Sequence, residues 1–230
     1  MDREAKRGGG MTFVNKKLSG THTSENAGSL RRGIRGFSLL EMSVVLAIIL
    51  IISCIGFITL QPSLKDQRLT TAYNATLMTL RRARQLAVDQ RKTYLVTFNT
   101  GGAPAVPDNI TLNILNAGAV GPLISTTTLP PDVQFLQVAV GSTPDNFGTG
   151  AFPIDFNVNN GPGGSNVIYF KPDGGAYDNI GRINNGVVYI SRVGEFGTSR
   201  AVTLYGLSGR LRGWKLYKNQ TAGTWQWTQI

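Results

Sequence analysis

Cysteine and histidine are almost absent from this chain, which narrows the chemistry it can perform. The 230 residues include one cysteine, Cys54, and one histidine, His22. A single cysteine excludes an intramolecular disulfide and a zinc site built from cysteines. A single histidine near the N-terminus leaves the rest of the chain without a Ser–His–Asp triad or the commonest general base. We therefore expect a non-enzymatic protein with no catalytic residues, no cofactor and no metal ion.

Charged residues are also sparse, and they are unevenly divided. They make up 16% of the chain, and the net charge is +10. Residues 1–36 hold eight Lys or Arg and three acids, so they carry +5, and residues 37–230 carry the other +5. Because residues 1–36 are polar and rich in Gly, Ser and Thr, we expect a disordered leader. Basic residues before a membrane span hold that end of the chain in the cytoplasm.

The segment that follows is apolar and long enough to cross a membrane. Residues 42–60 include no charge, and a helix of this length spans about 28 Å, close to the ~30 Å hydrocarbon core. Glu41 stands directly before this segment. A charge in a membrane helix costs about 2.5–3.5 kcal/mol. The carboxylate needs a partner, so we predict a function for Glu41.

Residues 36–41 read Gly-Phe-Ser-Leu-Leu-Glu, with arginines before them and the apolar segment after them. This order resembles the class III signal of type IV pilins and type II secretion pseudopilins. The resemblance implies that a prepilin peptidase cuts between Gly36 and Phe37 and then methylates the amine of Phe37. It assigns Glu41 to assembly. It also implies sibling pilins or pseudopilins and an inner-membrane assembly platform as partners.

Elementary electrostatics gives Glu41 the same role. The ammonium group created at Phe37 and the Glu41 carboxylate neutralise each other in a low dielectric, within one chain or between neighbours. Between neighbours, the pair would set the axial register of a filament. The simpler interpretation places Glu41 in the lipid headgroup region.

Two other interpretations of the apolar segment are weaker. A secretory signal has an apolar region of about 7–15 residues and a small-residue cut site, whereas this segment is longer and lacks a convincing site. Residues 51–54 loosely resemble a lipoprotein box, but Glu41 would be anomalous in one. We interpret Cys54 as a small apolar residue that faces lipid or another helix.

The helix is expected to continue beyond the membrane and to kink at Pro62. Over residues 63–91, apolar residues recur at spacings of three and four, which is typical of an amphipathic helix. The stripe consists of Leu69, Tyr73, Leu77, Leu80, Ala83 and Ala87. We predict an α+β, pilin-like fold. In it, one long bent helix (membrane half 37–62, amphipathic half 63–91) packs on an extracytoplasmic β-rich domain, 92–230.

Beyond Arg91 the sequence changes to short runs rich in β-branched and aromatic residues, separated by turn-forming residues. Because strands do not alternate with helices, we expect mainly antiparallel sheets. Residues 101–107 and 141–150 are expected to form exposed loops, the second of them mobile. The predicted strands are 93–99, 110–115, 133–140, 154–158, 167–170, 187–191, 201–205, 211–217 and 224–228.

The C-terminal half is similar to the GspH/FimT branch of the pilin superfamily, which implies two antiparallel sheets and a minor filament subunit. The residues that carry this similarity are 77–88, 168–175, 187–191, 200–205 and 209–212. In the FimT subset a Gly-Arg-x-Arg motif is implicated in DNA binding. Arg210 and Arg212 fill its two arginine positions.

Alternate residues of a strand point the same way, so these two arginines could face one nucleic-acid backbone. Lys215 and Lys218 follow, and Trp214, Trp225 and Trp227 offer stacking faces. The simpler interpretation is a solvated strand face beside a glycine turn, with the tryptophans closing the core.

Two further clusters receive no functional assignment. Arg81, Arg82 and Arg84 cannot share one helix face, so we expect them to be solvated or to pair with acids on neighbouring subunits. Asp173 and Asp178 in a glycine-rich stretch hint at calcium. Two carboxylates are too few for such a site, and we favour an ordinary turn.

The sequence thus predicts a single-pass inner-membrane protein with a cytoplasmic N-terminus and a periplasmic or extracytoplasmic β-domain, which then enters a filament. The first interpretation is a minor pseudopilin of a type II secretion system, which supports the export of proteins. The alternative is a FimT-like type IV minor pilin that binds DNA for natural transformation. The modest charge after cleavage favours the first, whereas Arg210 and Arg212 favour the second.

Overall fold

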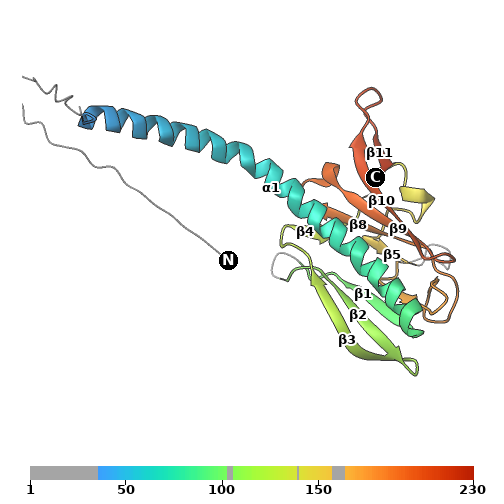
Figure 1. Ribbon diagram of the computed structural model, residues 1–230. Helices are drawn as coiled ribbons and strands as arrows, with labels where there is room; N and C mark the ends of the chain where they lie inside the picture. Colours follow the sequence, from blue (N-terminus) through green and yellow to red (C-terminus); the bar gives the residue numbers. More distant parts are fainter. Residues whose placement is uncertain (1–35, 103–105, 139, 157–163) are drawn as a thin grey trace, which may run out of the picture. The chain divides into compact units, whose positions relative to one another are not determined.

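The computed structural model describes residues 36–102, 106–138, 140–156 and 164–230 (Figure 1). All of the expected leader except Gly36 therefore lies outside the described residues. The chain divides into two compact units, Met1–Ile49 and Leu50–Ile230. One helix, α1 (Leu39–Gln90), begins in the first unit and continues into the second.

Helix α1 is 52 residues long because little in its sequence stops it before Gln90. Pro62 lies inside the helix, where it removes one main-chain N–H donor without ending the helix. Arg91 adopts a left-handed φ of 51°, a conformation that a right-handed helix does not propagate. The chain then turns directly into the first strand.

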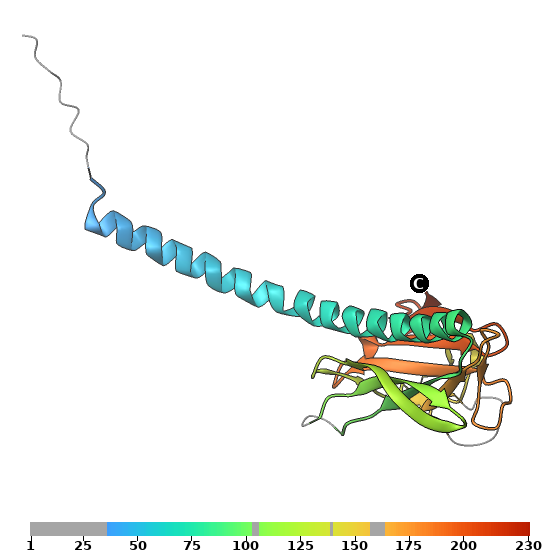
Figure 2. The same ribbon diagram turned by 60° about the horizontal axis from the view of Figure 1, so that its bottom comes forward.

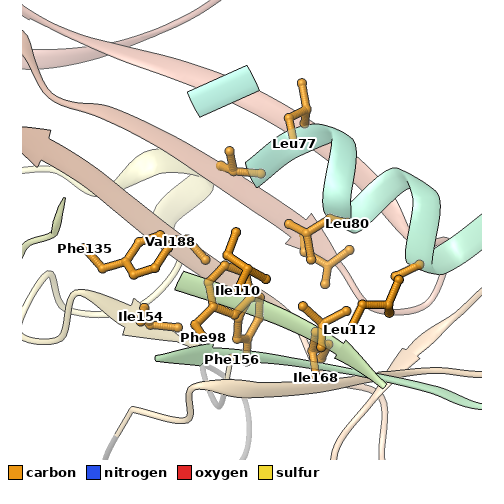
Figure 3. Packing of buried hydrophobic residues seen from close by; sticks show 14 of the residues in the cluster. Leu77, Leu80, Phe98, Ile110, Leu112, Phe135, Ile154, Phe156, Ile168 and Val188 are labelled. Atoms are coloured by element: carbon orange, nitrogen blue, oxygen red, sulfur yellow. The ribbon is translucent and has the colours of Figure 1, made fainter. Parts of the chain in front are cut away.

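The apolar stripe of α1 packs into the β-domain. All six residues of the predicted stripe are buried, as is Ala72. They belong to one core cluster with residues of both sheets, among them Phe98 and Val188. Figure 3 shows Leu80 facing Ile110 and Leu112. Burying one leucine side chain stabilises the folded state by about 1.5–3 kcal/mol relative to leaving it exposed. The stripe therefore holds the C-terminal part of α1 on the domain.

Within the described residues, the strands form two antiparallel sheets. The first sheet has the order β3-β2-β1-β6-β7, and the second has the order β11-β10-β9-β8-β4, with β5 paired to β8. The strands of the first sheet are β1 (Tyr94–Asn99), β2 (Asn109–Asn116), β3 (Ala119–Thr128), β6 (Val167–Phe170) and β7 (Ala176–Tyr177). Those of the second are β4 (Val133–Phe135), β5 (Ile154–Asp155), β8 (Gly186–Arg192), β9 (Arg200–Tyr205), β10 (Arg210–Lys218) and β11 (Trp225–Gln229). The α+β fold is therefore confirmed.

The second sheet is covered on both faces. Every residue of β8 is buried. Val188 and Ile190 belong to the core cluster that includes the α1 stripe, while Val187 and Tyr189 belong to a second cluster. Because successive strand residues point to opposite faces, α1 and the second cluster lie on opposite sides of this sheet. Figure 2 shows the C-terminal part of α1 lying along the sheets.

Two strands were not predicted, and two predicted strands are clearly shorter. Strand β3 is largely exposed and shows no alternation of buried and exposed residues, because it is an edge strand paired only with β2. Strand β7 has two residues, too few for a pattern. The strand predicted over 133–140 ends at Phe135, and the strand predicted over 154–158 ends at Asp155.

Glycine at position 213 permits close contact between α1 and the second sheet. A Cβ on Gly213 would lie 1.7 Å from the hydroxyl oxygen of Tyr73. Tyr73 is a buried member of the stripe, so its ring has little room to move. Helix and sheet approach closely here because β10 presents only backbone.

We expect Gly213→Ala to lower the free energy of unfolding by about 1–3 kcal/mol, because the added methyl group displaces the Tyr73 ring. Thermal unfolding of the full chain in detergent, followed by circular dichroism, measures the change. Gly141→Ala is the matched control, because no atom lies within 4 Å of its Cβ position. Equal melting temperatures for the two variants would contradict this account.

Candidate functional site

The expected processing residues directly precede α1. Phe37 is 75% exposed. Among the described residues, no atom beyond the chain neighbours of Gly36 lies within 4 Å of a Cβ position there. Glu41 lies in the first turn of α1, where the positive end of the helix dipole favours a carboxylate. The segment presents an accessible peptide bond followed at once by a helix with an acid in its first turn.

Among the residues that the structure describes, most of the large side chains in the apolar part of α1 are exposed. Its exposed large side chains are Leu39, Leu40, Met42, Val44, Val45, Leu46, Ile48, Ile49, Leu50, Ile51, Ile52, Ile55 and Phe57. By length and composition α1 is a candidate membrane span, and none of its most apolar 18-residue stretch is buried. Apolar surface of this extent marks a membrane or protein contact.

The four candidate DNA-binding residues all lie on β10, but they do not form one cationic face. Arg210 pairs with Tyr205 and Arg212 with Thr203 across the β9–β10 ladder. By strand alternation, Arg210, Arg212 and Lys218 share one face, and Lys215 points to the other. Arg210 is exposed.

Arg212 is engaged within the protein. Its Nη1 donates to Asp145 Oδ1 at 2.7 Å and to the Tyr205 hydroxyl at 3.0 Å. The Arg212 side chain is 26% exposed and that of Asp145 is 5% exposed. Asp145 also accepts a hydrogen bond from the Thr203 hydroxyl at 2.5 Å. Burial and the nearby Asp145 carboxylate raise the pKa of Tyr205, so this tyrosine stays neutral.

Asp145 comes from the stretch 141–150, which was expected to be an exposed, mobile loop. The prediction that this loop is exposed is wrong for the residues at its centre. Pro144 is buried within the short 3-10 helix η1 (Pro144–Asn146), and the Phe147 ring lies 4.9 Å from the Tyr205 ring. The loop packs down because an aromatic contact and an ion pair both attach it to the second sheet.

The lysines of this region lie over aromatic rings, and its tryptophans pack on the sheet. Lys215 Nζ lies 5.1 Å from the Tyr217 ring centre, and Lys218 Nζ lies 5.9 Å from that of Trp225. The three tryptophans pack against the second cluster on the sheet. Their faces are used in packing, as the simpler interpretation expected.

A cluster of charges that the sequence did not reveal fastens α1 to the domain. We name it the charged clamp, and its members are Lys65, Asp66 and Arg68 of α1 with Asp132, Arg192, Glu195 and Arg200 of the domain. Arg192 pairs with Asp132 at 3.3 Å and with Glu195. From α1, Lys65 reaches Glu195 at 3.7 Å and Arg68 reaches Asp132 at 3.6 Å.

Arg200 completes the charged clamp from strand β9. It lies 3.6 Å from Asp66 and donates to the Thr70 hydroxyl at 3.0 Å. The side chains of Arg192 and Arg200 are each 9% exposed. Nearly buried guanidinium groups require partners. We therefore interpret the charged clamp as a set of contacts that stabilises the fold. Sequence reasoning could note the charges but not the pairing, because the partners are up to 134 residues apart.

Asp173 and Asp178 are satisfied by their own turns. Asp173 accepts from the Gly175 amide at 2.9 Å and from the Tyr177 hydroxyl, and the Tyr177 bond holds the pKa of Asp173 below its usual value. Asp178 accepts from Arg182 Nε at 2.8 Å. Within the described residues, no group of three or more His, Cys, Asp or Glu side chains could hold a metal ion.

Comparisons with known proteins agree with the N-terminal segment. Residues 31–53 match the family model of the prokaryotic N-terminal methylation motif. No curated protein matches the chain by sequence. The solved structure of the type IV minor pilin FimU from Pseudomonas aeruginosa strain PAO1 is similar at 12% identity, with a TM-score of 0.42, and covers 64% of this chain and 88% of that chain.

The methylation motif leads into one long N-terminal helix and then two antiparallel sheets, which is the arrangement predicted above for a pilin-like fold. The motif is of the prepilin type, which implies processing by a prepilin peptidase and assembly with other pilins.

We expect Arg212→Ala to lower the free energy of unfolding by about 1–3 kcal/mol, because it leaves the Asp145 carboxylate buried without its cation. Arg210→Ala should change it by less than about 0.5 kcal/mol, because that side chain is exposed. Urea unfolding of the full chain in detergent, followed by tryptophan fluorescence, compares the two. Adding Asp145→Ala to Arg212→Ala should restore part of the lost stability. Equal stabilities of the Arg212→Ala and Arg210→Ala variants would overturn this assignment.

Proposed function

We propose that this protein is a structural subunit of a type IV pilin-like filament, anchored in the bacterial inner membrane before assembly. The exposed apolar part of α1 carries this proposal. In the membrane, lipid covers those side chains. In a filament, the helices of neighbouring subunits cover them, since lipid and leucine are equally apolar partners.

Processing prepares the chain for this role. Prepilin peptidase cuts after the accessible Gly36 and methylates Phe37, which places an ammonium group four residues before Glu41. The Glu41 carboxylate, in the first turn of α1, then pairs with the ammonium group of a neighbouring subunit. That pair fixes the axial position of the incoming subunit because a mismatched charge is costly in an apolar core.

We assign the filament to a type II secretion system, in which the protein is a minor pseudopilin. The Arg212–Asp145 pair supports this choice over the DNA-binding pilin. DNA binding through two neighbouring arginines requires both guanidinium groups, and Arg212 uses its own within the protein. We further place the leader in the cytoplasm and the β-domain outside the membrane, and assign the protein no catalytic activity.

The alternative, a FimT-like pilin that binds DNA, retains one favourable observation, namely the exposed Arg210. Titration of the full chain in detergent with single- and double-stranded DNA across a range of salt tests it. A pseudopilin should show no binding at low salt. Micromolar binding that weakens with salt and is lost in Arg210→Ala would support the DNA-binding function.

We expect Glu41→Ala to leave cleavage and methylation intact and to remove the protein from sheared filaments, because the ammonium group then lacks its partner. Co-expression with the prepilin peptidase and the assembly proteins, followed by mass spectrometry of the N-terminus and immunoblotting of the filaments, measures both steps. Glu41→Gln should fail like Glu41→Ala, since it keeps the shape but not the charge. Ser43→Ala is the neutral control on the same helix.

An uncleaved Gly36–Phe37 bond in the parent chain would contradict the processing step. Normal incorporation of Glu41→Ala would contradict the charge pair while leaving processing in place. The two steps of the proposal are therefore tested separately.

A further inference from the structure

The arginines of the β-domain and of the helix that packs on it form two groups. Those that pair with a carboxylate at 2.7–3.6 Å are Arg68, Arg182, Arg192, Arg200 and Arg212. In contrast, the other five form no ion pair with any residue that the structure describes: Arg81, Arg82, Arg84, Arg91 and Arg210. Three of these five, Arg81, Arg84 and Arg210, lie close together. These three side chains line the same hollow.

The hollow lies between α1 and the turn that joins β9 to β10, and its volume is about 420 Å³. Gln85 and Ser208 add polar groups to the three arginines, and no acidic residue lines it. We call it the arginine hollow. Three cations without an anion repel one another, so the hollow is complementary to negative charge.

Arg84 is held in place rather than swinging freely. Its Nε donates to the carbonyl oxygen of Gly174 at 3.0 Å, which leaves its two terminal nitrogens for another acceptor. Gly209 has a φ of 59°, and a Cβ there would lie 2.1 Å from the Gly174 oxygen and 2.5 Å from Arg84 Nε. Two glycine turns thus enclose the Arg84 side chain and orient its guanidinium group.

We propose that the arginine hollow receives carboxylate side chains of a neighbouring filament subunit. The inference rests on the proposed function, because Arg81 and Arg84 stand on α1, the helix whose apolar part neighbouring subunits cover in a filament. The guanidinium group binds a carboxylate through two parallel hydrogen bonds. Five other arginines among the described residues already form ion pairs with a carboxylate within the chain.

The observations favour a protein carboxylate over a nucleic acid. No aromatic side chain lines the hollow, so bases would find no stacking surface, whereas single-strand binding relies on such surfaces. The tryptophans of β10 and β11 pack on the second cluster instead. The hollow is a local depression that suits one or two side chains, and a nucleic-acid strand needs a longer cationic track.

The test reverses charge inside and outside the arginine hollow. Arg81→Glu with Arg84→Glu should leave cleavage and methylation unchanged and reduce incorporation into sheared filaments by about tenfold, because carboxylates then face carboxylates. Arg82→Glu with Lys92→Glu changes the net charge equally, but neither residue lines the hollow, so its incorporation should match the parent chain. Equal incorporation of both double variants would overturn the inference.

A photoreactive benzoylphenylalanine at position 85 identifies the occupant directly. In assembled filaments we expect crosslinks to an Asp- or Glu-bearing segment of another subunit, and replacing those acids by arginine should restore the Arg81→Glu, Arg84→Glu variant. Filaments that form normally without such crosslinks would overturn the inference while leaving the proposed function standing. Crosslinks to DNA would overturn both the inference and the assignment to a secretion system. A parent chain that never enters filaments would overturn both the inference and the proposed function.

Discussion

Burial of the α1 stripe against both sheets is the interaction on which the rest of the structure depends. The core cluster draws residues from α1, from β1, β2 and β6 of the first sheet, and from β8 and β9 of the second. Without the helix, both sheets would expose apolar faces to water. One helix therefore completes the domain with its C-terminal part and leaves its N-terminal part for lipid or for other helices.

Much of this fold could be predicted because its signals are local. A membrane-length apolar segment, an acid directly before it and a stripe with helical spacing are all visible within short windows of sequence. The burial of Leu69, Tyr73 and Leu80 follows from spacing alone. The central strands were also predictable, since buried β-branched and aromatic residues gather in short runs.

The parts that escaped prediction depend on contacts between distant residues. Strand β3 exists because β2 offers it a ladder, although its own side chains are mostly exposed. Arg212 looked like a free cation until the fold brought Asp145, 67 residues earlier, against it. The charged clamp and the arginine hollow likewise combine α1 with segments beyond residue 130, and no window of sequence contains both partners.

The charged clamp and the apolar stripe respond differently to their surroundings. Ion pairs that are partly exposed weaken as ionic strength rises, whereas salt does not screen the burial of leucine. The clamp holds the segment of α1 that directly follows Pro62. Concentrated salt should therefore detach the helix from the domain at that end first. The ionic strength of the solution would then set how much of α1 lies on the domain.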